Sequence, residues 1–528
     1  MFAPKSSSMR ITSIDTNLKT NTNIDNESEK KAVHLNGHLN TSDRTRSITK
    51  KSATYDGKLS IIKRYQIRDS LLTELFANNT HVSSIHNIIF ALIIFLTVTS
   101  LCDLVNDSKK FSAEFRIFTT NIVDVGNFFI IEALLHLVVL GLHFPLVFLC
   151  NLLQYQRLVT RFISIKDQPQ PDQRTVMRYW NEILNQNRYI FGFVYTIISA
   201  FGILGLSLFL TFHLDCKISC SFAIMMEMCR LLMKAHSFYI EKRQLHLEMK
   251  TLMKLSEKPD DSWQNFLALP SRPRLSRLVY FLFAPTLYYQ DSYPRTEKIR
   301  WPLLLTLSIQ FFAMIAFALI AISRYLVTNF SRVGLERYEI KNLFHQLNHL
   351  FVFGLLMYLM CFYGLFHIWH NIVGELLRFG DRKFYDDWWS STTLKEYYRK
   401  WNLIVQDWIF LYLYCPAYST FANKVTAANF VVFVSAIFHE LIITVSLRTF
   451  FPALFIFFAT GSYISYIMAS RFPKNAIQNI LFMLNTIIGW GLLTTLYSLE
   501  WYSRINCPAP SSSWIYFVIP RFITCIKM

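Results

Sequence analysis

Nine stretches of about twenty mostly apolar residues constrain the fold of this chain more than any other feature. They begin near Ile85, Asn127, Arg188, Ile218, Pro302, Phe344, Ala427, Phe450 and Ile477. As a helix, each stretch is long enough to cross a hydrocarbon core of ~30 Å. The 528 residues are 52% hydrophobic and include 47 Phe, more apolar surface than an ordinary water-soluble core can bury. The sequence therefore predicts an all-α, polytopic membrane protein with about nine transmembrane helices.

The chain divides into three regions of different composition. Residues 1–58 are rich in Ser, Thr, Asn and Lys and almost lack aromatic residues, so we expect a disordered cytosolic tail. Residues 59–84 mix apolar and basic positions at helical spacing, which predicts an amphipathic helix on the cytosolic membrane surface. Packing of that helix against the main body or a neighbouring subunit is an equal alternative. Residues 85–528 hold the spans and a lumenal C-terminal tail, with a short apolar stretch at 403–414 that we interpret as an interfacial or re-entrant helix.

The net charge of +18 is not spread evenly, and the loops 153–187 and 234–300 are rich in Lys and Arg. The positive-inside rule places these loops and the N-terminus in the cytosol. Because topology and lipid head groups explain the basic charge, and no nucleic-acid-binding signature appears, we expect no nucleic-acid partner. The same topology puts Cys507 and Cys525 on the oxidising side of the membrane, where we expect them to form a disulfide rather than remain free thiols.

One His-Glu pair interrupts the apolar stretch from Ala427 to Val445. Ionisable groups inside spans are costly and usually functional. A neutral imidazole at His439 suits a general base that acts on an alcohol, and the alternative is a histidine satisfied by a neighbouring helix. Glu440 points about 100° away around the helix, so it does not share the same proton. The pair lacks the second histidine of HExxH, and no other spacing predicts a metal site.

A dense aromatic and charged block lies between the sixth and seventh spans, on the expected cytosolic side. It contains Phe384-Tyr385-Asp386-Asp387-Trp388-Trp389 and Tyr397-Tyr398-Arg399-Lys400-Trp401-Asn402. One interpretation is an amphipathic belt at the water–lipid boundary. The other is a platform for a large polar cofactor, with cations for phosphates, tryptophan rings for a nucleobase and the Asn402 amide for a developing oxyanion. The chain has no GxSxG elbow, Walker A motif or dinucleotide fingerprint, which argues against a serine esterase or an ATP-driven pump.

These residues resemble a known family. The segment 384–389 resembles the FYxDWW(N) motif of the acyl-CoA-dependent membrane-bound O-acyltransferases, and His439 resembles their single histidine in a hydrophobic span. The similarity is closer to the sterol O-acyltransferases, and it covers the chain from about residue 65 to the end. It is carried by SLLTELF at 70–76, His236-Ser237-Phe238, YFLFAPTLYYQDSYPR at 280–295 and LEWYSRINCP at 499–508. The 280–295 segment and the C-terminal cysteine pair favour the sterol branch over the diacylglycerol branch.

The resemblance implies nine spans in the endoplasmic reticulum membrane, assembly into dimers or tetramers, and a reaction between a long-chain acyl-CoA and cholesterol or another sterol drawn from membrane lipid. Acyl-CoA is then a co-substrate, and no bound cofactor is expected. His439 corresponds to the catalytic base, and Asn402 to the asparagine beside the thioester. We assign acyl-CoA binding to Trp388, Arg399, Trp401, Gln406, Tyr414, Lys424 and Ser435, and the family motif to Phe384, Tyr385, Asp387, Trp388 and Trp389.

Two positions depart from the family pattern. Ser390 replaces the asparagine that closes the motif, and Gln406 replaces the usual histidine four residues after Asn402. Gln406 still donates a hydrogen bond but cannot take up a proton. We therefore predict acyl transfer to a sterol 3β-hydroxyl. The alternatives are transfer to diacylglycerol or a fatty alcohol and, in another class, a lipid transporter or an inactive sterol sensor.

Overall fold

The computed structural model describes residues 65–106, 125–165, 171–186, 188–259, 263–335, 340–458, 460–461, 476–508, 515 and 518–525. All of these belong to one compact unit, Tyr65–Met528. Across these ranges the chain forms helices and no strand, with isolated bridges at Arg68–Asp381 and Arg295–Phe379. The all-α class is therefore confirmed. The predicted disordered tail, 1–58, lies outside the described residues.

Seven helical segments in the described part of the chain are long and apolar enough to cross a membrane. They cover Thr80–Thr99, Val125–Ile163, Gln173–His213, Trp301–Phe330, Phe351–Leu376, Lys424–Leu447 and Ala476–Asn506. A polytopic membrane protein is thus confirmed, but a count of nine is not. The expected span from Ile218 forms helix α9 (Ile218–Lys242), which carries Glu227, Arg230 and Lys234 and is too polar to join the seven. The expected span from Phe450 is described only as far as Gly461.

Several long helices contain a stretch of wider π-helical turns, which single insertions into an α-helix produce and which recur at functional sites. The helices that continue through such a stretch are α4 (Val125–Val138) into α5 (Phe144–Ile163), α7 (Arg188–Ile197) into α8 (Leu206–His213), α13 (Trp301–Ala321) into α14 (Thr328–Phe330), α15 (Ile340–Cys361) into α16 (His370–Leu376) and α18 (Leu403–Ile409) into α19 (Cys415–Phe421). The intervening π segments are η1 (Val139–His143), η2 (Ile198–Gly205), η3 (Ile322–Val327), η4 (Phe362–Trp369) and η6 (Phe410–Tyr414).

Helix α9 lies at the centre of the largest hydrophobic cluster. Met225, Met228, Leu231 and Ala235 along this helix are fully buried. The helix packs against α4, α8, α12 (Leu275–Phe283) and α20 (Lys424–Leu447). Because protein surrounds it on several sides, its charged residues find partners inside the fold rather than facing lipid. A second cluster joins α5 to three short helices, α6 (Gln173–Asn185), α10 (Met249–Glu257) and α11 (Trp263–Ala268).

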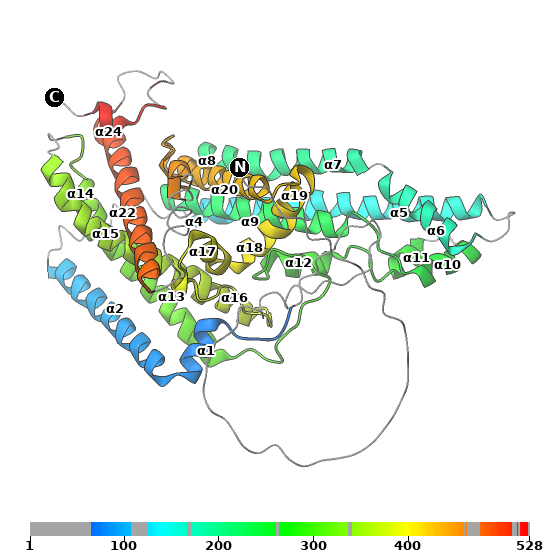
Figure 1. Ribbon diagram of the computed structural model, residues 1–528, viewed down its shortest axis with the longest axis horizontal. Coiled ribbons are helices and arrows are strands. Elements are labelled where there is room, and N and C mark those ends of the chain that lie inside the picture. Colours follow the sequence, from blue (N-terminus) through cyan, green and yellow to red (C-terminus); the bar gives the residue numbers. More distant parts are fainter. Residues whose placement is uncertain are drawn as a thin grey trace, which may run out of the picture. The chain divides into compact units, whose positions relative to one another are not determined.

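Two glycines allow helices α15 and α22 (Ala476–Asn506) to approach closely (Figure 1). A Cβ atom added to Gly354 would lie 2.9 Å from the Gly491 backbone, and one added to Gly491 would lie 2.9 Å from Phe351 Cα. Small residues at such crossings let two membrane helices gain van der Waals contact along their backbones. The crossing thus fixes α22 against α15.

The helix predicted at 59–84 is found only in part within the described residues. Helix α1 covers only Leu71–Asn78 and is followed by α2 (Thr80–Asn106), while residues 65–70 are not helical. The Arg68 amide donates to Gly380 O at 3.0 Å, and Arg68 O accepts from the Arg382 amide at 3.1 Å. The Arg68 side chain also pairs with Asp381 at 2.7 Å. These tertiary partners take up the backbone hydrogen-bonding groups of Arg68, which a helix would otherwise pair internally. The segment is therefore not helical despite its local helical pattern.

Cys507 and Cys525 are joined by a disulfide, with Cα atoms 6.1 Å apart. The bridge connects the end of α22 to the residue that follows α24 (Arg521–Thr524). The Arg521 guanidinium strengthens this connection by donating to Cys507 O at 2.8 Å. The C-terminal segment is thereby fastened to the end of a long apolar helix.

Candidate active site

Asn402 lies at the junction between α17 (Leu394–Trp401) and α18. Its backbone is extended, with φ −140° and ψ 93°, so it separates the two helices. Its side-chain Oδ1 accepts from the Val405 amide at 3.1 Å and caps α18. With Oδ1 occupied, the NH₂ group is the free donor of this side chain, since no described residue accepts from it. Asn402 is therefore held in place as the N-cap of α18. Its amide NH₂ group is available to donate to a substrate.

The aromatic motif holds this junction through backbone hydrogen bonds on both sides of Asn402. The Leu403 amide donates to Phe384 O at 2.9 Å, and the Asp386 amide donates to Lys400 O at 2.8 Å. The motif segment therefore runs alongside the end of α17. A displacement of the motif would displace Asn402 with it.

Most of the motif is core rather than a surface belt. Phe384, Tyr385 and Trp388 are 1%, 0% and 4% exposed. The Trp388 ring lies 4.8 Å from Trp401 and 4.9 Å from Phe362, in edge-to-face contacts typical of buried aromatic clusters. The interpretation of these three residues as a water–lipid belt is therefore wrong. Acyl-CoA contact by Trp388 and Trp401 stays a prediction.

The Tyr385 hydroxyl lies 2.7 Å from His367 Nδ1. Burial raises the pKa of this hydroxyl above its usual value, so it stays neutral and keeps its hydrogen. The contact ties the motif to η4, a π-helical part of the fifth apolar segment. The family motif is thus anchored to a membrane-embedded helix.

Hydrogen bonds at Ser390 and Trp389 join the motif to two helices, α17 and α22. Lys400 Nζ lies 3.0 Å from Asp387 Oδ1 and donates to Ser390 Oγ at 2.9 Å. Ser390 Oγ in turn donates to Asp387 O at 2.7 Å. The hydroxyl at this departure from the family pattern therefore joins the motif to α17. Asn479 of α22 donates to Trp389 O at 3.0 Å and links the motif to the seventh apolar segment.

His439 lies two-thirds of the way along α20 and is exposed, whereas its neighbour Glu440 is 6% exposed. His439 Nδ1 is 2.7 Å from Ser435 O. A carbonyl oxygen only accepts, so the neutral ring carries its hydrogen on Nδ1, an assignment inferred from the hydrogen bond. Nε2 is then left with the lone pair that a general base requires. Glu440 accepts from Tyr497 and from the Phe455 amide, and therefore does not share the proton of His439.

One aromatic ring connects His439 to the Asn402 junction. The Phe458 ring lies 5.0 Å from the His439 ring and 6.1 Å from the Tyr398 ring. Tyr398 is on α17, four residues before Asn402. Helix α20 also packs against η6 and α19, which continue from α18 (Figure 1). Phe458 thus links the helix that carries His439 to α17, which ends directly before Asn402.

The other predicted acyl-CoA positions fall on the same helices. Gln406 is one turn after Asn402. All side chains from 402 to 411 are partly exposed. A helix packed in a core would bury one face completely, so this helix is not a core helix. The Tyr414 ring stacks on Phe410 at 5.6 Å and on Tyr418 at 6.2 Å. Lys424 is exposed at the start of α20, Ser435 is one turn before His439, and Arg399 is exposed on α17. Their roles as ligand contacts stay predictions.

A polar network that the sequence did not reveal joins η6 to α9. Tyr412 donates to Glu241 Oε1 at 2.7 Å and lies 3.1 Å from Ser237 Oγ, which also accepts from the Tyr289 amide at 2.7 Å. Burial, followed by the nearby Glu241 carboxylate, raises the pKa of the Tyr412 hydroxyl, so it remains a donor. The family-like triplet at 236–238 was the only sequence signal for this network. Its effect is to hold the helix that begins at Asn402 against the central helix.

Comparison with known proteins places this arrangement in a family. The chain is 34% identical to sterol O-acyltransferase 1 of Mus musculus over 308 residues, which are 58% of this chain and 54% of the mouse protein. It is 36% identical to sterol O-acyltransferase 2 of Rattus norvegicus over 256 residues, which are 48% of this chain and 49% of the rat protein. The chain thus spans about half the length of the curated relatives it matches. The family model of the membrane-bound O-acyltransferases matches residues 174–499, more than half of the chain. The protein belongs to the membrane-bound O-acyltransferase family.

Proposed function

We propose that this protein transfers a long-chain acyl group from acyl-CoA to the 3β-hydroxyl of cholesterol or a related sterol. The names of the relatives support this choice of acceptor. The observation that carries the proposal is the hydrogen-bonding state of two side chains on α20 and at the start of α18, which Phe458 links through Tyr398. His439 has its Nδ1 engaged and its Nε2 available, and Asn402 has its Oδ1 engaged and its NH₂ available.

The reaction follows from these two groups. His439 Nε2 takes the proton of the sterol hydroxyl while that oxygen attacks the thioester carbonyl carbon. A C–O bond forms, and the carbonyl oxygen gains negative charge that the Asn402 amide stabilises by a hydrogen bond. The C–S bond then breaks, and the proton on His439 passes to the departing CoA sulfur. Steryl ester and free CoA result, His439 is neutral again, and no acyl-enzyme forms.

The membrane setting brings the two substrates together. Exposed Arg399 and Lys424 are suited to the CoA phosphates, and the aromatic row Phe410, Tyr414 and Tyr418 offers an apolar surface for the acyl chain. The sterol reaches His439 laterally from the bilayer. Holding both substrates out of water favours transfer over hydrolysis. We assign the protein to the endoplasmic reticulum membrane as a dimer or tetramer, by analogy with the family.

The test uses purified full-length protein in sterol-containing micelles with labelled oleoyl-CoA and either cholesterol or diacylglycerol. Wild type is compared with His439→Ala and with His213→Ala, which alters an exposed histidine at the end of α8. We expect steryl ester from wild type and His213→Ala, and none from His439→Ala. Triacylglycerol instead of steryl ester would identify the diacylglycerol branch. Intact acyl-CoA with both acceptors would favour a transporter or sensor and would refute the proposed activity.

A further inference from the structure

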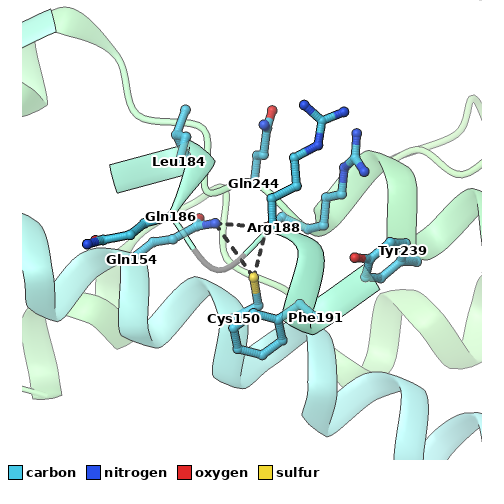
Figure 2. A pocket seen from close by; sticks show the side chains of 9 residues that line it. Cys150, Gln154, Leu184, Gln186, Arg188, Phe191, Tyr239 and Gln244 are labelled. Atoms are coloured by element: carbon cyan, nitrogen blue, oxygen red, sulfur yellow. Dashed lines mark hydrogen bonds between the residues drawn. The ribbon is translucent and has the colours of Figure 1, made fainter. Parts of the chain in front are cut away.

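A small pocket lies where α5, the start of α7 and the end of α9 meet, apart from the candidate active site. Its lining includes Cys150, Gln154, Gln186, Arg188 and Arg243. Figure 2 shows Cys150 and Phe191 at its base, with Arg188 and Gln244 extending away from them. The lining combines apolar side chains with three glutamines and two arginines, so it contains two guanidinium groups.

The base of the pocket is rigid because buried side chains of α5 bind the end of α9. Gln154, 5% exposed, donates to Arg243 O at 3.1 Å, and its Oε1 accepts from the Leu245 amide at 2.8 Å. Cys150 Sγ lies 3.2 Å from the same Arg243 oxygen. Asn151, fully buried, donates to Lys242 O. These contacts fix the backbone that carries Arg243, so its side chain starts from a defined position.

The two arginines interact with each other without a compensating acid. Neither Arg188 nor Arg243 forms an ion pair with any residue in the described part of the chain. Burial, and next the charge of Arg188, lowers the pKa of the Arg243 guanidinium. The aromatic face of Tyr239, with its centroid 5.9 Å from the Arg243 guanidinium carbon, offers only weak compensation. Two positive charges are thus held at a rigid base without an ion-pairing carboxylate among the described residues, which favours the binding of an anion.

An amide donor adds to the two cations. Arg157 donates to Gln186 Oε1 at 3.4 Å, which occupies the amide oxygen of Gln186 and leaves its NH₂ group as a donor. Guanidinium groups form paired, charge-assisted hydrogen bonds to the oxygens of phosphates. The donor set is thus chemically matched to a phosphate group.

The surroundings place this pocket at the membrane surface. Directly after Arg188, α7 presents Tyr189, Ile190 and Phe193, which are 88%, 62% and 67% exposed, and such a face is suited to lipid. The preceding helix α6 is amphipathic and carries exposed arginines, as expected for water. An exposed tyrosine between an apolar and a polar segment is typical of the membrane interface. We therefore expect the pocket to lie near the depth of the phospholipid phosphates.

We propose that Arg188 and Arg243 bind the phosphate of an anionic phospholipid in the cytosolic leaflet. The two guanidinium groups and the Gln186 amide contact the phosphate, and the acyl chains lie along the exposed apolar face of α7. This site is separate from the acyl-transfer reaction. Its ligand is a structural or regulatory lipid rather than a substrate.

The test measures lipid-induced thermal stabilisation of the full-length protein in detergent micelles. Dioctanoyl phosphatidic acid is titrated against wild type, Arg188→Gln/Arg243→Gln and the matched control Arg174→Gln/Arg178→Gln, which removes two exposed charges from α6. We expect the first double variant to bind at least about tenfold more weakly, as loss of charge-assisted bonds implies, and the control to bind as wild type does. Dioctanoylglycerol, which lacks the phosphate, should not stabilise any variant.

The same titrations contain the results that would overturn the proposal. Equal affinity of wild type and Arg188→Gln/Arg243→Gln would exclude the pocket, and an equal loss in the control would show a general charge effect. Stabilisation by inorganic phosphate or CoA that matches phosphatidic acid would identify a soluble ligand and refute the lipid assignment. Because the two arginines repel, the lipid-free double variant should unfold no earlier than wild type, which separates loss of binding from misfolding. Arg188→Lys/Arg243→Lys should retain part of the affinity.

Discussion

Replacing Asn402 with Asp or Ala separates the two roles of this side chain. Asn402 Oδ1 caps α18 through the Val405 amide at 3.1 Å, and its NH₂ is the proposed oxyanion donor. Asp caps helices as well as Asn does, so Asn402→Asp should keep the stability of wild type to within a few tenths of a kcal/mol. It removes the donor and adds a negative charge beside the developing oxyanion. Turnover should therefore fall by at least the roughly 100-fold that is typical for loss of one oxyanion donor.

Asn402→Ala removes both the cap and the donor. We expect a loss of about 1 kcal/mol in stability from the missing cap, together with a similar fall in turnover of roughly 100-fold. The assay is the initial rate of labelled steryl ester formation at saturating oleoyl-CoA, normalised to the folded fraction. Thermal unfolding of the same samples measures the stability difference.

The comparison between the two variants tests the reasoning. If Asn402→Asp turns over at a rate near that of wild type, the amide is no oxyanion donor and the proposed mechanism loses that step. If both variants lose activity only in proportion to unfolded protein, the residue acts solely as a helix cap. A loss of activity at unchanged stability in Asn402→Asp is the result that the structure predicts.

Three further predictions concern packing and ion pairs outside the candidate active site. Glu375→Leu removes the buried carboxylate that pairs most closely with Arg382 and leaves only Asp69, 4.0 Å away, so it should destabilise the protein by roughly 3–5 kcal/mol, seen as early thermal unfolding; unchanged stability would contradict this pairing. Gly491→Ala forces a Cβ atom against Phe351 and should cost about 1–3 kcal/mol, which Gly489→Ala, with open space around it, should not. A hydrogen bond from Arg300 lowers the pKa of Asp69, so its stabilising contribution is complete above the usual aspartate pKa and disappears as pH falls through the lowered value. Thermal unfolding between about pH 5 and pH 3 should therefore show a smaller acid-induced loss for Asp69→Asn than for wild type.

The segment at 65–70 shows why part of the fold could not be predicted from local pattern. Its sequence continues a helical spacing of apolar and basic residues, yet Asp69 and Arg68 pair with Arg300 and Asp381, which are more than 200 residues away. Local periodicity carries no information about such partners. Helix α9, the span expected from Ile218, is not among the seven apolar segments, because a count of apolar residues treats a helix buried by protein and a helix solvated by lipid alike.

The sequence by itself determined the all-α membrane class, the positions of seven apolar helices and the identity of the family motif, because apolar length and local residue spacing are properties of the chain alone. Only the tertiary structure decided that the motif is buried and that its backbone braces Asn402. It also decided which nitrogen of His439 keeps a lone pair, and it brought His439 near α17 through Phe458. These features depend on contacts between segments distant in the chain, and such contacts form only when burial of aromatic rings and pairing of backbone groups fix one arrangement of the helices.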